Sequence, residues 1–212
     1  PYTTLFRSGV TLCGEGAGTL PGGERLEGGH VVLAAGAWTS FWGPRLGLDL
    51  PVYPVRGQII ALEQNPLPIR RVVFSARGYA VPKVRGLVAV GATEDRAGFD
   101  ASVTLAGVAY LSAVAPALVP ALERARFRHA WAGLRPWSAT GLPLLGPVPG
   151  WRGLTVAAGH YRNGILLSAV TGRAVADLLL DGRSAFLGGE PAAFAPPGAA
   201  QQPPTPRAGL GR

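Results

Sequence analysis

The chain has 212 residues, of which 48% are hydrophobic and 15% are charged, and its formal net charge is +8. This apolar content excludes an intrinsically disordered chain, and the scattered glycines and prolines exclude collagen. The basic residues are spread along the sequence and form only one close trio, at Arg124, Arg126 and Arg128. We therefore predict a folded protein that does not bind nucleic acid.

The cysteine and histidine residues indicate the cellular compartment and whether a metal is bound. Cys13 is the only cysteine, so we expect a reducing compartment, namely the cytoplasm. The histidines, at positions 30, 129 and 160, lack the spacing of metal ligands, and no metal is expected. No signal peptide is visible, and the absence of methionine leads us to interpret the chain as a fragment of a longer protein.

One uncharged segment, 101–122, is long enough to cross a membrane. It is rich in Ala, Ser and Thr, and Pro116 and Pro120 interrupt its second half. We therefore predict a helix over 104–115 that packs on a domain, and no membrane span.

The apolar runs predict an α/β (α+β) fold in which two similar strands flank an insertion. Residues 31–36 form a continuous apolar run, typical of a parallel strand buried on both faces, with a short helix or loop over 37–46. A second such strand is predicted over 153–159, followed by a helix over 165–180 that stops at Gly182.

Between these two strands the pattern is that of an antiparallel sheet with the 104–115 helix laid on it. The predicted strands are 53–62, 72–74, 79–82, 87–92 and 124–134. The last alternates, with Phe127, His129 and Trp131 on one side. Residues 188–212, rich in Pro, Gly, Ala and Gln, are predicted to be a disordered tail that contributes nothing to folding.

Two side chains of the inserted sheet are candidates for binding an anion. Arg135 ends a predicted strand and is followed by Pro136, so a stiffly held guanidinium could bind a carboxylate through two hydrogen bonds. Tyr79 carries a hydroxyl that could help. Each has an ordinary alternative, a surface arginine and a packed aromatic ring.

A third candidate is the polar turn at 159–164, between the second buried strand and its helix. Free backbone N–H groups and the positive end of the helix dipole suit an anion or a partly negative ring oxygen there. An ordinary strand-to-helix loop remains the alternative. No G-x-G-x-x-G phosphate loop follows a strand, since the glycine-rich segment 14–18 lacks one before it.

Six motifs in this order resemble the FAD-dependent amine and D-amino-acid oxidases, most closely the bacterial glycine oxidases of the ThiO type. They are VVLAAGAW (31–38), PVRGQ (54–58), YAVP (79–82), VGATE (90–94), AGLRP (132–136) and GHYRNGILL (159–167).

The resemblance implies a domain division and a site. Residues 1–50 would be the remnant of an FAD-binding domain, 51–134 the substrate-binding domain, 135–187 the returning part of the FAD domain and 188–212 the tail. Catalytic roles fall on Arg135, as the carboxylate clamp, and on Tyr79 and Arg162. Flavin contacts fall on the following residues: Ala35, Gly36, Trp38, Gly159, His160, Asn163, Gly164, Ile165 and Leu166.

The implied reaction is oxidative deamination of glycine or a related small amino acid, giving a keto acid, ammonia and hydrogen peroxide, in thiamine biosynthesis. FAD would be held non-covalently, because the related enzymes that attach flavin use a C-terminal cysteine and this chain has only Cys13. The expected partners are the amino acid and oxygen, with homo-oligomer formation left open.

Two departures from the family pattern bear on the substrate. Arg77 stands where a histidine is expected, and the segment 137–141 lacks the usual acidic residue before Gly141. The alternatives are a sarcosine or D-amino-acid oxidase or dehydrogenase of the same family, or a non-catalytic binding domain.

Overall fold

The computed structural model describes residues 11–13, 17–19, 25–188 and 191–197. The chain divides into two compact units, which are described separately. Unit 1 comprises Pro1–Tyr53 and Pro136–Arg212, and unit 2 comprises Pro54–Arg135.

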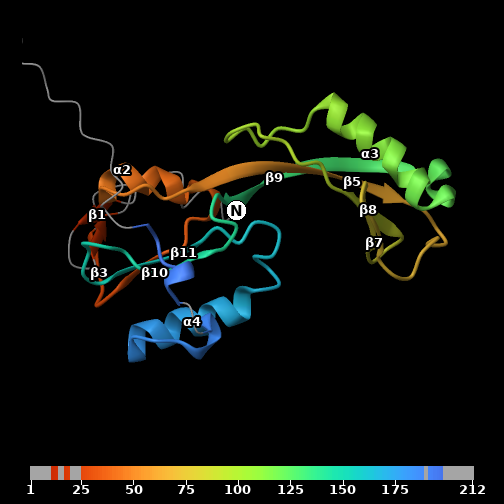
Figure 1. The fold of residues 1–212 in the computed structure, drawn as a ribbon. Coiled ribbons are helices and arrows are strands. Elements are labelled where there is room, and N and C mark those ends of the chain that lie inside the picture. Colours follow the sequence, from red (N-terminus) through yellow and green to blue (C-terminus); the bar gives the residue numbers. More distant parts are fainter. Residues whose placement is uncertain (1–10, 14–16, 20–24, 189–190, 198–212) are drawn as a thin grey trace, which may run out of the picture. The chain divides into compact units, whose positions relative to one another are not determined.

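Unit 1 is built on a three-stranded sheet in the order β10-β11-β4, formed by Leu144–Pro147, Leu154–Ala158 and Val31–Leu33 (Figure 1). Strands β11 and β4 pair in parallel, which confirms the two predicted parallel strands, whereas β10 is antiparallel and was not predicted. The expectation that both faces are buried is wrong for β4. Val32 is 38% exposed, because the described residues cover only one face of this edge strand.

The helices of unit 1 follow these strands. After β4 come a 3-10 helix, η1 (Gly36–Trp42), and the short α2 (Gly43–Leu46), as predicted. After β11 comes α4 (Ser168–Asp181), which ends at Gly182 with φ of 69°. The predicted start of this helix at 165 is wrong, because one separate turn, closed by the Leu167 amide on the Asn163 carbonyl at 2.8 Å, precedes α4.

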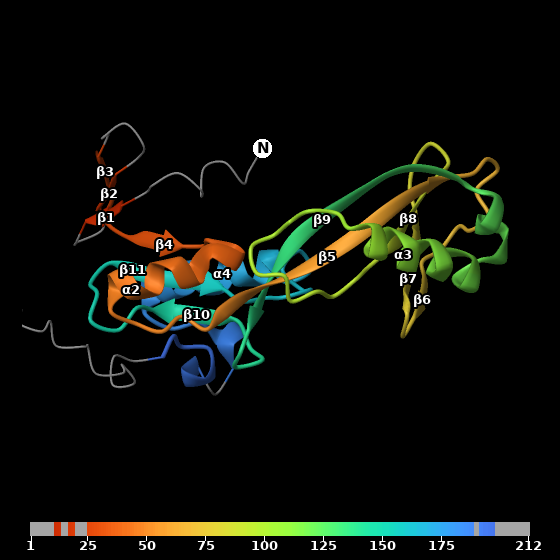
Figure 2. The same ribbon diagram turned by 90° about the horizontal axis from the view of Figure 1, so that it is seen from above.

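A small antiparallel sheet that the sequence did not predict precedes β4 (Figure 2). Its strands are β1 (Thr11–Cys13), β2 (Ala17–Thr19) and β3 (Arg25–Glu27). The expectation that no strand precedes the glycine-rich segment 14–18 is therefore wrong, because β1 ends directly before it. The segment leads into the strand β2 and not into a helix, so it still lacks the strand-to-helix context of a phosphate loop.

The C-terminal part of unit 1 corrects the prediction of a disordered tail from 188 onward. After η3 (Ala185–Leu187), the short η4 (Pro191–Ala193) leads to Phe194, whose carbonyl accepts a hydrogen bond from the Leu145 amide at 2.7 Å. The Phe194 side chain packs against a cluster that includes Leu145 and Leu187. Residues 191–197 are therefore ordered by contacts with β10, while 189–190 and 198–212 lie outside the described residues.

Unit 2 is organised around a five-stranded sheet in the order β6-β7-β8-β5-β9, where every pairing from β6 to β5 is antiparallel. The strands are β5 (Val52–Glu63), β6 (Val73–Ser75), β7 (Gly78–Pro82), β8 (Leu87–Gly91) and β9 (Arg126–Ser138). Each includes the core of a predicted strand, so the antiparallel inserted sheet is confirmed.

One face of this sheet is covered by α3 (Leu105–Leu118), as Figure 1 shows. Ile60, Val90 and Leu111 are fully buried in the core between them. The predicted end at 115 is wrong by one turn. Pro116 lies within the last turn, where only one intrahelical bond is lost, and the short η2 (Pro120–Arg124) follows. None of the described helices is long and apolar enough to cross a membrane.

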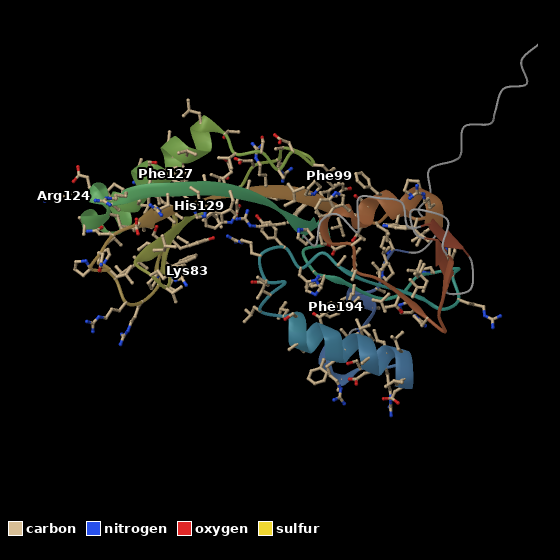
Figure 3. All side chains as sticks on the ribbon, turned by 180° about the vertical axis from the view of Figure 1, so that it is seen from behind. Lys83, Phe99, Arg124, Phe127, His129 and Phe194 are labelled. Carbon is tan, nitrogen blue, oxygen red and sulfur yellow. The ribbon has the colours of Figure 1, made fainter. Side chains whose placement is uncertain are left out.

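We call the opposite face of this sheet the free face. It carries Phe74, Tyr79, Gly91, Ile59, Gly57 and the odd-numbered residues of β9 from 127 to 135. Side chains alternate along a strand, and Ala130 packs into the core on the α3 side, so Phe127, His129 and Trp131 point the other way. Phe127 is 52% exposed and Trp131 40%. Figure 3 labels Phe127 and His129 on β9.

Candidate active site

Two of the predicted catalytic side chains, Tyr79 and Arg135, lie on the free face. Tyr79 is paired with Gly91, and Gly91 is paired with Ile59, so these three residues point to the same side of the sheet. Gly57 lies two residues before Ile59 and shares its face. A Cβ added at Gly57 would overlap the Arg135 guanidinium, which places that group above Gly57.

Arg135 has unused hydrogen-bonding capacity. The side chain is partly buried, and its Nη1 donates to the carbonyl of Thr93 at 3.0 Å. It makes no salt bridge with any residue that the structure describes. A guanidinium has five N–H donors in a planar fork, so four remain. A charged group in this state can bind a carboxylate through two parallel hydrogen bonds.

Tyr79 is held by its neighbours on the free face. Its ring stacks on Phe74 with centroids 6.4 Å apart and an interplanar angle of 7°. On the other side, a Cβ at residue 91 would come within 2.7 Å of the Tyr79 hydroxyl oxygen, so Gly91 is required for the close approach. The hydroxyl makes no hydrogen bond to the described part of the chain. It is therefore available to a ligand.

Unit 1 brings together the two predicted flavin-binding segments. Because β4 and β11 are parallel, their carboxyl ends lie at the same edge of the sheet, the usual position of ligands in such sheets. Ala35 and Gly36 follow β4, and Gly159 and His160 follow β11. Ala35 is buried, and its carbonyl accepts the amide of the partly buried Trp38 at 3.0 Å.

The turn before α4 presents backbone donors. The amides of Gly164, Ile165 and Leu166 donate no hydrogen bond to any described residue, whereas the Asn163 amide is used by the His160 carbonyl at 3.0 Å. Ile165 is 94% exposed and Leu166 80%. Three consecutive free amides beside two exposed apolar side chains fit the edge of a partly negative aromatic ring system such as that of flavin.

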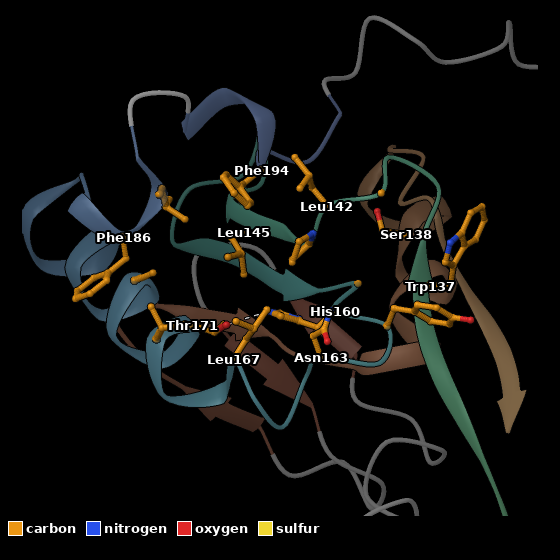
Figure 4. A pocket seen from close by; sticks show the side chains of 17 residues that line it. Trp137, Ser138, Leu142, Leu145, His160, Asn163, Leu167, Thr171, Phe186 and Phe194 are labelled. Atoms are coloured by element: carbon orange, nitrogen blue, oxygen red, sulfur yellow. Dashed lines mark hydrogen bonds between the residues drawn. The ribbon is translucent and has the colours of Figure 1, made fainter. Parts of the chain in front are cut away.

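His160 lines a cavity of about 430 Å³ in unit 1 (Figure 4). Its Nε2 lies 2.9 Å from the hydroxyl oxygen of Thr171 on α4. Gly159 and Asn163 also line this cavity, with Phe194 from the C-terminal segment. Burial lowers the pKa of His160 below its ordinary value of 6.5, so the imidazole is neutral at pH 7.

Two other positions named by the family pattern are not part of the free face. Arg162 belongs to unit 1, where its guanidinium lies 5.3 Å from the centroid of the Tyr161 ring, and its predicted role in lining the active site stays a prediction. Arg77, at the position where the family pattern has a histidine, is exposed in the turn before β7, and its carbonyl accepts the Tyr110 hydroxyl at 2.7 Å.

The sequence did not reveal how Arg135 and Tyr79 are supported. Gly57 and Gly91 were recognised only as parts of motifs, although an isolated glycine inside a predicted strand signals a close approach of another group. The role of the Thr93 carbonyl had no sequence signal, because any residue supplies a carbonyl. Among the described residues, no cluster of three or more potential metal ligands occurs.

The protein-family comparison matches residues 4–178 to the DAO family, described as FAD dependent oxidoreductase. Glycine oxidase from Geobacillus kaustophilus is 47% identical over 187 residues, which are 87% of this chain and 49% of that protein. The bifunctional protein ThiO/ThiG of Nostoc sp. is 40% identical over 159 residues, 73% of this chain and 24% of that protein.

The structural comparison agrees. The crystal structure of the Geobacillus glycine oxidase has a TM-score of 0.78 at 42% identity, covering 85% of this chain and 48% of that one. Iminodiacetate oxidase from Chelativorans sp. BNC1 has a TM-score of 0.80 at 28% identity, covering 90% and 52%. The chain spans about half the length of these relatives. It belongs to the DAO family of FAD-dependent oxidoreductases.

Proposed function

We propose that the protein to which this chain contributes is a glycine oxidase, which oxidises glycine or a related small amino acid to the keto acid, ammonia and hydrogen peroxide. For glycine the balanced reaction consumes one oxygen and one water and yields glyoxylate. The single observation that carries the proposal is the Arg135 guanidinium, held above Gly57 and without a carboxylate partner among the described residues.

Arg135 provides the first step, which is to bind and orient the substrate. A carboxylate held by two parallel hydrogen bonds has a fixed plane, so the attached α-carbon has few remaining positions. Tyr79 on the same face offers a hydroxyl to one carboxylate oxygen or to the amine. Apart from its amine, a small amino acid such as glycine has no other polar group, so this pair is decisive for its orientation.

When bound, FAD would supply the redox chemistry, namely hydride removal from the α-carbon and transfer of the electrons to oxygen. We assign the amides of Gly164, Ile165 and Leu166 to the negative edge of its ring, since fixed N–H dipoles stabilise charge that develops during reduction. The carboxyl ends of β4 and β11 would hold neighbouring parts of the cofactor. Because Cys13 is the only cysteine, we propose that the cofactor is held non-covalently.

The substrate is the least constrained part of the proposal. Sarcosine, D-amino acids and iminodiacetate, the compound in the name of one structural relative, also present an amine beside a carboxylate and fit the same clamp. The likeness to a ThiO/ThiG protein supports a role in thiamine biosynthesis. A cytoplasmic location is consistent with the single cysteine.

The test is an amine panel on the FAD-loaded holoenzyme, with hydrogen peroxide as the readout. The proposal predicts flavin absorbance and peroxide release with glycine, and none with methylamine, which lacks the carboxylate. Peroxide release with sarcosine or a D-amino acid, but not with glycine, would instead assign the protein as a sarcosine or D-amino-acid oxidase of the same family. A protein that binds FAD and oxidises none of these would instead be a binding domain.

A further inference from the structure

A polar network in unit 2 leads to Arg135, and its centre is a carboxylate oxygen of Asp95, whose side chain is 34% exposed while the groups that donate to it are buried. Oδ2 of Asp95 accepts three hydrogen bonds, from the Thr93 hydroxyl at 2.9 Å, from Gln58 Nε2 at 2.9 Å and from Arg56 Nε at 3.3 Å. Arg56 and Thr93 are each 8% exposed and Gln58 2%. Polar groups so well shielded from water are held firmly in place when all of them are paired.

Thr93 connects this network to Arg135. The backbone amide of Thr93 donates to the backbone carbonyl of Gln58 at 3.3 Å, and the Thr93 hydroxyl oxygen accepts a hydrogen bond from the backbone amide of Gln58 at 3.1 Å. Its own carbonyl oxygen accepts Nη1 of Arg135 at 3.0 Å. Thr93, whose carbonyl orients the guanidinium, is thus fixed to Gln58 of β5 by two hydrogen bonds, one from its backbone amide and one to its hydroxyl oxygen.

The other side of the network is tied to the start of α3. The Gln58 side-chain oxygen accepts the Thr104 amide at 2.8 Å, and Thr104 is the residue that caps α3. A Cβ at Gly107 would overlap the side-chain amide of Gln58, so the glycine at this position allows that amide to lie against α3. Burial alone raises the pKa of Asp95, but the hydrogen bonds from Gln58, Thr93 and Arg56 lower it by more. The net pKa is therefore below its ordinary value, and the carboxylate stays charged at neutral pH.

We propose that Thr93 and Gly57 are positioning residues for the carboxylate clamp. Thr93, held by Asp95, fixes the plane of the Arg135 guanidinium through one N–H, and Gly57 leaves the space in which that plane lies. This inference rests on the proposed function, because it assumes that Arg135 binds the substrate carboxylate. Both residues are proposed to act on the substrate through Arg135.

The physical need for such a device follows from the size of the substrate. A guanidinium binds a carboxylate in two parallel bonds only when the two planes align, and a free arginine side chain has several rotatable bonds. One fixed N–H removes most of this freedom before the substrate arrives. A glycine molecule has no side chain with which to correct a poorly oriented clamp.

The first test compares Thr93→Val with Thr93→Ser in the holoenzyme. Valine keeps the shape of threonine but removes the hydroxyl that joins Asp95 to Gln58, whereas serine keeps the hydroxyl. We expect Thr93→Val to raise the KM for glycine about tenfold or more, the effect of weakening a hydrogen bond to a charged group. The Kd of glycolate, a carboxylate without an amine, should rise equally by calorimetry. Thr93→Ser should restore both values to near wild type.

The second test uses Gly57→Ala, which removes no member of the Asp95 network and places a Cβ whose three nearest atoms all belong to the Arg135 guanidinium. It should also raise the glycine KM and the glycolate Kd about tenfold or more. Gly172→Ala in α4 is the matched control, because a Cβ there meets nothing within 4 Å. FAD content and melting temperature are measured for every variant, and Gly57→Ala carries the test if Thr93→Val does not fold.

Arg135→Leu separates this inference from the proposed function. If Arg135→Leu raises the glycine KM while Gly57→Ala and Thr93→Val leave both constants unchanged, the clamp is real and the positioning inference is overturned. If Arg135→Leu itself leaves the glycine KM unchanged, the proposed function fails. Loss of affinity in Thr93→Ser equal to that in Thr93→Val would also overturn the inference, because the hydroxyl would then have no role.

Discussion

Replacement of Arg135 by leucine removes the proposed clamp and keeps a side chain that fits a partly buried site. One of the five guanidinium N–H groups is used by the Thr93 carbonyl, so enough donors remain for a bidentate bond to a carboxylate. Removing one partner of a desolvated pair of this kind costs about 2 to 5 kcal/mol, which corresponds to a rise of about 30- to 5,000-fold in the glycine KM.

The assay is steady-state peroxide release by the holoenzyme, with the flavin spectrum as a check on cofactor content. Arg135→Lys should recover only part of the loss, since an ammonium cannot reproduce the planar fork. A carboxylate-free amine, if turned over at all, should be equally poor with all three proteins. Unchanged glycine kinetics in Arg135→Leu, or loss of the flavin, would refute the reasoning and make Arg135 a structural residue.

Three further predictions concern stability, measured as the free energy of unfolding in urea. Burial lowers the pKa of His160, so the unfolded state binds the proton more readily than the folded state, and the free energy of unfolding should fall as the pH drops below 6.5. Between pH 7.5 and 5.5, the free energy of unfolding should fall less in His160→Gln than in the wild type. Phe194→Ala should cost about 1 to 3 kcal/mol, whereas no change would mean that the C-terminal segment contributes nothing. Leu111→Ala, in the fully buried core, should cost about 2 to 5 kcal/mol, against little for Leu105→Ala at a site 85% exposed; equal costs would contradict the packing of α3.

The sequence predicted those elements whose pattern has one simple cause. The two parallel strands could be predicted because a continuous apolar run closed by glycine is typical of a buried strand. The end of α4 could be predicted at Gly182, where φ of 69° favours glycine. The antiparallel strands of unit 2 were visible from alternation and turn residues.

The elements that were missed depend on partners distant in the sequence. Strand β10 exists because Leu144 and its neighbours pair with β11, and the C-terminal segment is ordered because Phe194 reaches β10. Neither pairing leaves a local pattern in a Pro- and Gly-rich stretch. The helix start was placed too early because the exposed apolar Ile165 and Leu166 continue the helical spacing without being packed.

The candidate site divides in the same way. Arg135 and Tyr79 were predicted as functional side chains, and the sheet register then placed them on one face. What could not be predicted is the support beneath them, because Gly57 contributes by having no side chain and Thr93 contributes a backbone carbonyl. Such contributions become visible only when the neighbouring strand is known.

The most direct test of the central claim is a crystal structure of the FAD-loaded holoenzyme with glycolate bound. The account predicts that both carboxylate oxygens of glycolate lie at about 2.7 to 3.2 Å from guanidinium nitrogens of Arg135, with Nη1 still bonded to the Thr93 carbonyl. A glycolate bound elsewhere, with Arg135 making no contact to it, would contradict the account.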